Sequence, residues 1–246
     1  MYKKLFVIVL MIVVAGLAFS QAPSAAELLR RVDTNEVYST IQYDGEMIIE
    51  YQNRRYVKVM KAWARGNADS FIEFTNPEDK GYKYLKKGGR LYMYSPDTEK
   101  VEPISGNMLK ESMMGSDLSY GDAIDNATLS SRYNPVLKGS ETWNGRTAWV
   151  LELNAKSRSE SYPKRTLWID QENGDVLHYE LFALSGAKLK EYNLIRVETF
   201  GTRRFPVEIE IMDLLRRGSK TTFIMRNVIL DKPIDDSVFS ERNLKR

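Results

Sequence analysis

The sequence predicts a mainly β protein with a few helices, in which one antiparallel sheet of about ten or eleven strands curves around a partly open concave face. Three observations predict this fold. Apolar and polar residues alternate over many short segments, turn signals that contain Gly or Asn separate these segments, and helical spacing appears only within residues 25–37 and 107–126. No repeat, low-complexity tract or linker divides the chain, so we expect one folded domain.

The first 20 residues are typical of a signal peptide. Lys3 and Lys4 precede an uncharged apolar run. The segment ends at Ala18-Phe19-Ser20, which has small residues, Ala18 and Ser20, at the two positions that a signal peptidase recognises. The run is shorter than the roughly 20 residues that span a bilayer. We therefore expect export to the periplasm and cleavage after Ser20, with residues 1–20 as signal peptide and 21–246 as the folded domain. The alternative is an uncleaved N-terminal anchor.

Composition excludes several classes of protein. Removing Lys3 and Lys4 from the 36 basic residues leaves 34 against 33 acidic ones, a formal charge of +1. A nucleic-acid-binding protein would need a strongly basic surface, so we expect no nucleic-acid partner. The chain has no cysteine, which excludes both disulfides and the attachment of a lipid to a cysteine, as in bacterial lipoproteins.

One helix is expected before the strands, over residues 25–37. Ser24 and Glu27 have the spacing of a capping box, and Pro23 precedes them. Apolar residues then recur at helical spacing, at Ala25, Leu28, Leu29 and Val32.

The strands follow from alternation and turns. Within 40–51, apolar side chains share one parity and polar ones the other, with a single exception at Ile48. Turn signals such as Gly88-Gly89, Asn144-Gly145 and Ser185-Gly186 separate the later segments. The expected strands are 40–51, 55–66, 70–77, 81–87, 90–96, 146–156, 164–170, 176–184, 187–201, 205–215 and 220–231.

The strands are rich in Met and aromatic residues, which form adaptable apolar binding surfaces but also pack ordinary cores. Two short helical segments cover only part of so large a sheet, so we expect an apolar cavity without polar anchors. Strand parity separates the two faces of a strand, but it does not decide which face lies inside. The candidate lining residues are Tyr43, Met47, Ile49, Trp63, Trp149, Leu151, Phe223 and Met225.

Residues 110–123, KESMMGSDLSYGDA, resemble a catalytic or metal-binding loop at first sight. Asp117, Asp122 and Asp125 lack the ligand spacing of a calcium loop, and Ser116 has no lysine three residues later to serve as a base. Ser119 and Asp122 instead form a capping box for a short helix over 120–126. The polar residues therefore form turns and caps, and we expect the loop to be a mobile lid that places three apolar residues over the mouth of the cavity: Met113, Met114 and Leu118.

Catalytic and metal chemistry find little support in the sequence. His178 is the one histidine, and we expect it half-exposed on a strand, without a nucleophile beside it. With no cysteine, zinc and other soft-metal sites are excluded, and no G-x-S-x-G motif is present. We expect no catalytic residue, no metal, no cofactor and no enzymatic activity.

The chain resembles the outer-membrane lipoprotein-sorting proteins, the LolA-like group, over essentially all of residues 21–246. The matching residues are Phe74, Pro77, Lys80-Gly81, Leu85, Gly89-Arg90-Leu91, Tyr94, Pro96, Ile104, the run SMMGSDLSYGD, Gly145, Tyr162, Leu167-Trp168-Ile169-Asp170, Ser185-Gly186-Ala187-Lys188, Pro206 and the closing DKPIDDSVFSERNL. The resemblance implies a half-open β-barrel whose apolar concave face is covered by helices and takes up acyl chains. The best-studied carriers are shorter than this chain. The arginine that latches their lid has three possible counterparts here, Arg54, Arg55 and Arg65.

The expected function is that of a monomeric periplasmic carrier, which shelters the acyl chains of a lipoprotein or lipid and transfers them toward the outer membrane. Each CH₂ exposed to water costs roughly 0.8 kcal/mol, so such chains need shelter in transit. The expected partners are the cargo, an inner-membrane donor complex and an outer-membrane acceptor. The alternative is a lipid-sensing adaptor, as in a related anti-sigma-factor regulator, or an accessory protein of a lipid exporter, which uses the same cavity.

Overall fold

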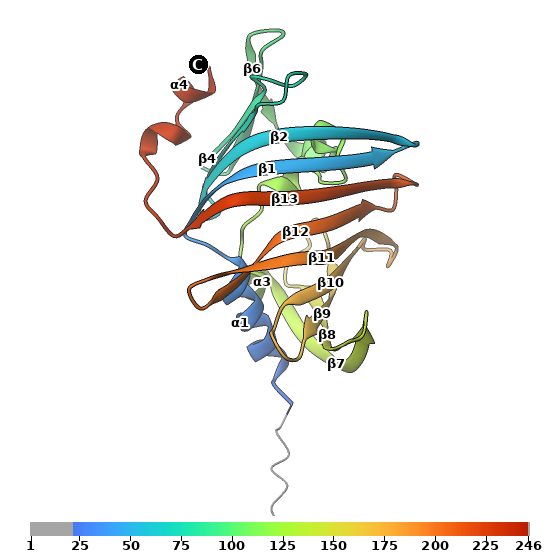
Figure 1. The fold of residues 1–246 in the computed structure, drawn as a ribbon. Helices are drawn as coiled ribbons and strands as arrows, with labels where there is room; N and C mark the ends of the chain where they lie inside the picture. Colours follow the sequence, from blue (N-terminus) through green and yellow to red (C-terminus); the bar gives the residue numbers. More distant parts are fainter. Residues whose placement is uncertain (1–21, 246) are drawn as a thin grey trace, which may run out of the picture.

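The computed structural model describes residues 22–245, and it confirms a mainly β protein built on one curved antiparallel sheet (Figure 1). The sheet has thirteen strands in the order β6-β5-β4-β3-β2-β1-β13-β12-β11-β10-β9-β8-β7. Its strands are β1 (Thr40–Tyr51), β2 (Arg54–Arg65), β3 (Asp69–Phe74), β4 (Lys83–Lys87), β5 (Arg90–Ser95), β6 (Lys100–Ile104), β7 (Tyr133–Trp143), β8 (Arg146–Ala155), β9 (Lys164–Asp170), β10 (Val176–Phe182), β11 (Lys188–Phe200), β12 (Arg203–Asp213) and β13 (Ser219–Leu230). The expected signal peptide, residues 1–20, lies outside the described residues.

Strands that follow one another along the chain pair with each other, except β6 and β7, and the first strand pairs with the last. Ile41 of β1 lies opposite Leu230 of β13, and this pair of strands forms the middle of the sheet. The edges are β6 and β7, which do not pair with each other in the described part of the chain. The sheet is therefore curved but not closed.

The expected number of about ten or eleven strands is too low, because the sequence pattern did not predict the two edge strands, β6 and β7. β6 contains Pro103 and β7 contains Pro135. Proline removes a backbone donor and argues against a strand in the middle of a sheet, but an edge strand tolerates it. The remaining eleven strands correspond to those expected.

The curvature has local causes in the strands. Register shifts occur in β1, β7, β10 and β11, and such irregularities bend a strand and increase its twist. Gly45 in β1 lies against Met60 of β2, where an added Cβ would come within 2.8 Å of the Met60 Cγ atom. A side chain at Gly45 would therefore force the side chain of Met60 to move.

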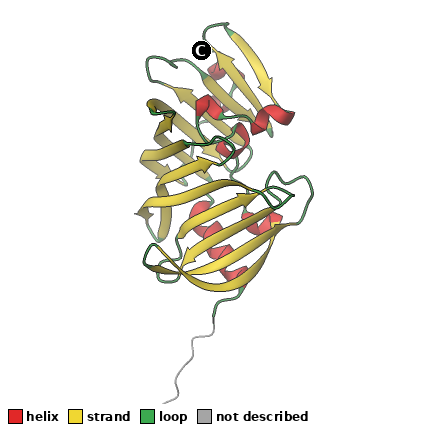
Figure 2. Ribbon diagram, turned by 90° about the vertical axis from the view of Figure 1, so that its right-hand side faces the viewer, coloured by secondary structure: helices red, strands yellow, loops and turns green. Residues whose placement is uncertain are grey.

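The helices are short, and most of them lie on the concave side of the sheet (Figure 2). The helical elements are α1 (Ala25–Glu36), η1 (Gly106–Lys110), η2 (Met113–Gly115), α2 (Tyr120–Ala123), α3 (Leu129–Arg132), η3 (Asp236–Phe239) and α4 (Glu241–Leu244). The capping boxes expected at Ser24 and Ser119 are both formed. The helix expected over 120–126 is shorter, since it ends at Ala123.

α1 packs on one half of the concave face. Leu28, Leu29 and Val32 of this helix are buried against side chains of β7, β8 and β9. At the opposite end of the chain, Phe239 and Leu244 pack on Phe71 and Leu85, which belong to the other face of β3 and β4. The two chain ends thus cover opposite faces of the sheet.

The connection between β6 and β7, residues 105–132, has to pass from one edge of the sheet to the other. We call it the cover segment. It contains η1, η2, α2 and α3, and several of its apolar side chains pack on the core formed by β1 to β5.

Candidate functional site

A cavity of about 310 Å³ lies between the sheet, α1 and the cover segment. This volume is at the lower end of the roughly 300–1,000 Å³ that is usual for small-molecule sites. Most of the lining is apolar and comes from α1, the cover segment and strands of both halves of the sheet. The apolar lining residues include Val32, Ile41, Met47, Met60, Ile72, Met113, Leu118, Leu167, Leu181, Phe205, Ile209, Phe223 and Met225.

Four of the residues predicted to line the cavity do so. Tyr43 and Met47 reach it from β1, and Phe223 and Met225 reach it from the neighbouring β13. Tyr43 and Phe223 pack edge to face, with ring centroids 6.0 Å apart. The structure thus brings these four side chains together at the middle of the sheet, and their role in binding a ligand remains a prediction.

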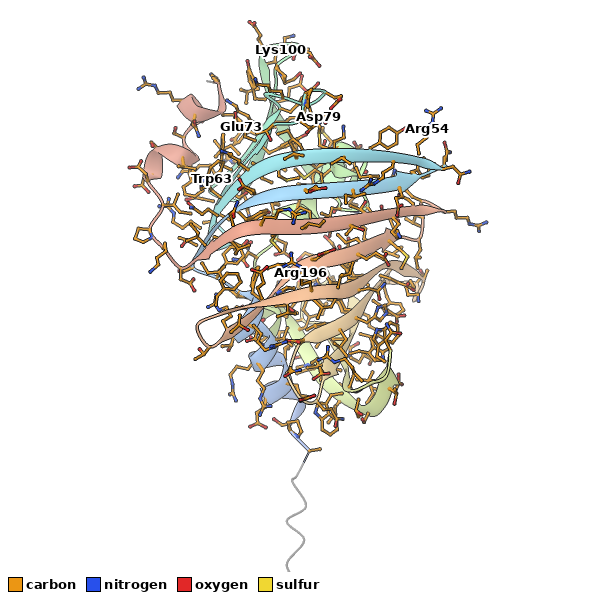
Figure 3. All side chains as sticks on the ribbon, in the orientation of Figure 1. Arg54, Trp63, Glu73, Asp79, Lys100 and Arg196 are labelled. Carbon is orange, nitrogen blue, oxygen red and sulfur yellow. The ribbon has the colours of Figure 1, made fainter. Side chains whose placement is uncertain are left out.

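The other four predicted lining residues lie elsewhere in the structure. Ile49 is buried in the core beside Met47. Trp63, near the end of β2 opposite to Arg54 (Figure 3), packs on Phe71 and the C-terminal residues of the other sheet face. Trp149 and Leu151 are on β8, and α1 packs over that part of the sheet. Strand parity could not show where a helix would occupy the concave face.

Two of the three apolar residues predicted for the lid line the cavity. Met113 and Leu118 do so, and Met113 is 3 % exposed. Met114 packs instead on the core of the first half of the sheet, where its sulfur accepts a hydrogen bond from the Tyr84 hydroxyl at 3.0 Å. The cover segment therefore contributes to the core as well as to the cavity wall.

Asp117 fixes the cover segment to the sheet. Its side chain is buried and accepts hydrogen bonds from the hydroxyls of Ser219, at 2.9 Å, and Thr221, at 2.6 Å. Its second carboxylate oxygen accepts from the backbone N–H of Asp213 at 3.1 Å. These partners lie on β12 and β13, so the lid expected to be mobile is held by buried polar contacts.

Two basic residues add to this attachment. The Lys190 Nζ atom, on β11, donates to the backbone oxygen of Asp117 at 2.8 Å and to the Asp122 carboxylate at 2.6 Å. Burial acts to raise the pKa of Asp122, but Lys190 and the N–H of Ser119 outweigh it, so this pKa is lowered. Arg216 donates to the backbone oxygens of Gly115, at 2.9 Å, and Ser116, at 2.6 Å.

The three arginines considered as a lid latch have other surroundings. Arg65 pairs with Asp69 at 2.7 Å and with Asp236 on the far side of the sheet. Arg54 and Arg55 are exposed at the start of β2, next to the β1–β2 turn (Figure 3). Arg216, which no sequence pattern distinguishes, is the arginine of the β12–β13 turn that contacts the cover segment.

One end of the cavity is polar, contrary to the expected absence of polar anchors. Glu36 reaches it from the end of α1 and Arg165 from β9, together with Tyr162, Tyr179 and Tyr192. Burial, and then the nearby Asp33 carboxylate, raise the pKa of Glu36 from 4.5 to about 7. Burial also raises the pKa values of Tyr179 and Tyr192, whose rings stack 4.2 Å apart. Neither Glu36 nor Arg165 belongs to a recognisable motif, so sequence reasoning missed both.

His178 is buried rather than half-exposed. Its ring is 2 % exposed, stacks on Trp143 with a centroid separation of 4.0 Å, and has its Nδ1 atom 2.8 Å from the Asn193 side-chain oxygen. Trp143 belongs to β7, the edge strand that the sequence pattern did not predict, which is why the burial was not expected. Within residues 22–245, no group of three or more His, Cys, Asp or Glu side chains is arranged to hold a metal ion.

Across the described helices, none combines the length and apolar character needed to cross a membrane. Among curated proteins, none matches the sequence. A family model described as "Uncharacterized protein" matches residues 66–246, which is most of the chain.

Solved structures with this fold are similar over nearly their full length. A DUF1329 family protein from Desulfovibrio piger has a TM-score of 0.80 at 21% identity, over 89% of this chain and 97% of that one. A domain from Vibrio parahaemolyticus, described as an outer membrane lipoprotein-sorting protein, has a TM-score of 0.78 at 18% identity, over 90% and 98%. A LolA superfamily protein from Nitrosomonas europaea has a TM-score of 0.75 at 22% identity, over 90% and 100%. The shared feature is the LolA-like fold, a single antiparallel sheet that is not closed.

Proposed function

Since this chain belongs to the LolA-like group by its fold, and to the family whose model spans residues 66–246, we propose that it is a periplasmic carrier of acyl chains. In this proposal the cavity shelters part of a lipoprotein or lipid, and the protein passes it from an inner-membrane donor complex toward an outer-membrane acceptor. The residues 1–20 serve as a cleaved signal peptide, and the mature protein acts as a monomer. The cargo leaves unchanged, so the proposal assigns no catalytic step to the cavity.

The observation that carries the proposal is the apolar cavity between the sheet and the cover segment. Met47, Phe223 and Met113 come from three separate segments and meet around the same space. Burial of apolar surface stabilises by roughly 25 cal/mol per Å², without directional contacts. A site of this kind can hold a hydrocarbon chain firmly and still accept chains that differ in length.

Transfer of a labelled lipid between donor and acceptor vesicles tests the proposal. The wild-type protein should accelerate transfer, and native mass spectrometry of freshly purified protein should show a retained lipid. Ala123→Phe places a ring in the cavity wall without adding a buried charge, and it should reduce both the retained lipid and the transfer rate. Ala187→Phe, at an exposed turn position, is the matched control and should leave both unchanged.

A lipid-sensing adaptor is the second candidate function, and the attachment of the cover segment favours it. Asp117, Lys190 and Arg216 hold that segment through several hydrogen bonds, which is suited to a ligand that stays bound. An adaptor would retain lipid without transferring it and would bind a protein partner in a fixed ratio. Retained lipid combined with unaccelerated transfer would therefore favour the adaptor over the carrier.

A further inference from the structure

The polar end of the cavity contains hydrogen-bonding groups that the protein itself does not satisfy. The hydroxyls of two tyrosines at this end, Tyr179 and Tyr192, make no hydrogen bond to another side chain or backbone group of the described chain. Groups of this kind that face a cavity are available to a ligand.

Arg165 also lines the cavity, and its positive charge acts on Tyr179 and Tyr192. Its Nε atom donates to the Tyr133 hydroxyl at 2.9 Å, and the guanidinium lies over the Tyr133 ring at 4.9 Å and the Tyr162 ring at 5.6 Å. These contacts fix the plane of the group. They leave both terminal nitrogens without a hydrogen bond or an ion pair to any residue between 22 and 245.

Most of the other charged groups of the cavity wall are already paired. Asp33 accepts from the backbone N–H groups of Leu129, at 2.7 Å, and Ser130, at 3.0 Å. Asp122 pairs with Lys190 at 2.6 Å. The terminal nitrogens of Arg132 pair with two carboxylates, those of Asp125 at 2.8 Å and Glu160 at 3.2 Å.

Glu36 is the remaining charged group of the wall, and it forms no ion pair within the described chain. Its pKa of about 7 means that the carboxyl is partly protonated at neutral pH, so it opposes the positive charge of Arg165 only in part. Arg165 is therefore the cationic side chain of this wall whose charge is least compensated.

We propose that Arg165 and the surrounding tyrosines bind the anionic head of a single-chain amphiphile, a carboxylate or a phosphate, while its hydrocarbon chain extends along Met47 and Phe223. The inference rests on the proposed function, since it concerns the same cavity, and it adds the chemical class of the cargo. The two free nitrogens of a guanidinium match two oxygens of a carboxylate or phosphate, and tyrosine hydroxyls donate to the oxygens that remain. The volume of about 310 Å³ suits one small amphiphile.

Isothermal titration of the delipidated protein with four probes tests the inference. Dodecanoate and dodecyl phosphate carry the anionic heads, dodecanol carries the same chain without charge, and inorganic phosphate carries the charge without a chain. Because a hydrogen-bonded charge contributes about 1.5–3 kcal/mol, the wild-type protein should bind the two anionic amphiphiles roughly ten- to a hundredfold more tightly than dodecanol. This comparison requires no variant.

Arg165→Met should abolish this preference and leave the affinity for dodecanol unchanged, because its side chain keeps much of the apolar stem. Arg165→Lys should restore part of the preference, since it returns the charge but not the two-nitrogen geometry. Arg90→Met removes an exposed arginine at the start of β5 and should leave all four affinities unchanged.

Each other outcome has a definite meaning. Equal affinity of the wild-type protein for dodecanoate and dodecanol would overturn the role of Arg165 and leave the carrier proposal standing. Failure to bind any of the three chains would overturn the carrier proposal itself. Inorganic phosphate that binds as tightly as dodecyl phosphate would indicate a site for a small anion, and an equal loss for all probes in Arg165→Met would indicate a purely structural arginine.

Discussion

Asp117 shows how one polar residue can determine the behaviour of an apolar cavity. Its carboxylate is almost fully buried and is shared among a backbone N–H and two hydroxyls on β12 and β13. A buried carboxylate is tolerated only where such donors surround it. Asp117 therefore contributes to the position of the cover segment over the cavity, together with Lys190 and Arg216.

We predict that Asp117→Ala lowers the free energy of unfolding by about 3 kcal/mol, because it leaves the Ser219 and Thr221 hydroxyls and a backbone N–H without their acceptor. Urea denaturation monitored by tryptophan fluorescence measures this loss. Glu111→Ala, at an exposed position of the same segment, is the control and should change the stability by less than about 0.5 kcal/mol. Equal stability of the two variants would contradict the anchoring role.

Glu36 makes stability depend on pH in a calculable direction. The folded protein keeps a proton on Glu36 up to about pH 7, whereas the unfolded chain releases it near 4.5. Between these values the folded state binds more protons, so the free energy of unfolding falls as the pH rises through this range and remains lower above it. Each pKa unit corresponds to about 1.4 kcal/mol, so the total effect is at most about 3–4 kcal/mol.

Glu36→Gln should therefore stabilise the protein at about pH 8 and have little effect at about pH 5, because glutamine resembles the protonated form. Chemical denaturation of the variant and the wild type at both values measures the difference. Glu172→Gln, in the exposed turn after β9, should show no such difference between the two values. A gain of the same size at both values would mean that the ionisation of Glu36 is not its cause.

At the scale of elements, the cover segment forms one wall of the cavity, and we predict that its motion controls access. It joins the two edge strands, and Arg216 of the β12–β13 turn binds backbone oxygens in its tightest turn. Local opening requires only the contacts of the opening segment to break, so weakening a few of them changes the opening rate more than the global stability.

Arg216→Ala should speed hydrogen exchange of residues 112–116 and the release of bound lipid severalfold, while the exchange of β1 and β13 remains slow. Hydrogen exchange with mass spectrometry, together with a lipid-release assay, measures both effects. The neighbouring Arg217 is exposed and serves as the matched control in Arg217→Ala. Unchanged exchange in Arg216→Ala would mean that Arg216 does not hold the segment closed.

The elements that could be predicted from the sequence are those in which local pattern and tertiary environment agree. α1 and its capping box follow from the spacing of Ser24, Glu27 and the apolar residues, and β1 follows from its alternation. The edge strands β6 and β7 did not follow, because their prolines are unfavourable for any strand except one with a free side. Alternation along a strand depends on neighbouring residues, whereas the position of that strand within the sheet depends on contacts far apart in the sequence.

The candidate site was predictable to a smaller extent for the same reason. Alternation placed Tyr43 and Met47 on one face of β1, and Phe223 and Met225 on one face of β13. These four residues line the cavity. Where α1 would pack on that face depends on contacts far apart in sequence, so Trp149 and Leu151 could not be separated from the lining residues. Arg165 is an ordinary arginine in the sequence, and only its surroundings distinguish it.

At the scale of the whole molecule, a ligand that binds the cavity of the folded protein should raise the stability of the entire sheet. We predict that delipidated protein melts at a lower temperature than protein that retains its lipid. Adding an amphiphile that binds the cavity, at about a hundred times its dissociation constant, should raise the free energy of unfolding by about 2.7 kcal/mol. Differential scanning calorimetry measures the shift, and a ligand that binds without raising the melting temperature would have to bind the unfolded chain equally well.

The pairing of the first strand with the last has a consequence for how the chain folds. Strands β1 to β6 and β7 to β13 can each form from hairpins between sequence neighbours, but the contact between Ile41 and Leu230 joins residues from opposite ends of the chain. Pairings of such separation form late and slowly, because the entropy of closing a long loop must first be overcome. A ribosome that has not yet released residues 219–230 therefore holds a chain that cannot complete its sheet. For a protein that we propose is exported, this delay leaves the sheet incomplete while the nascent chain can still be threaded across the inner membrane.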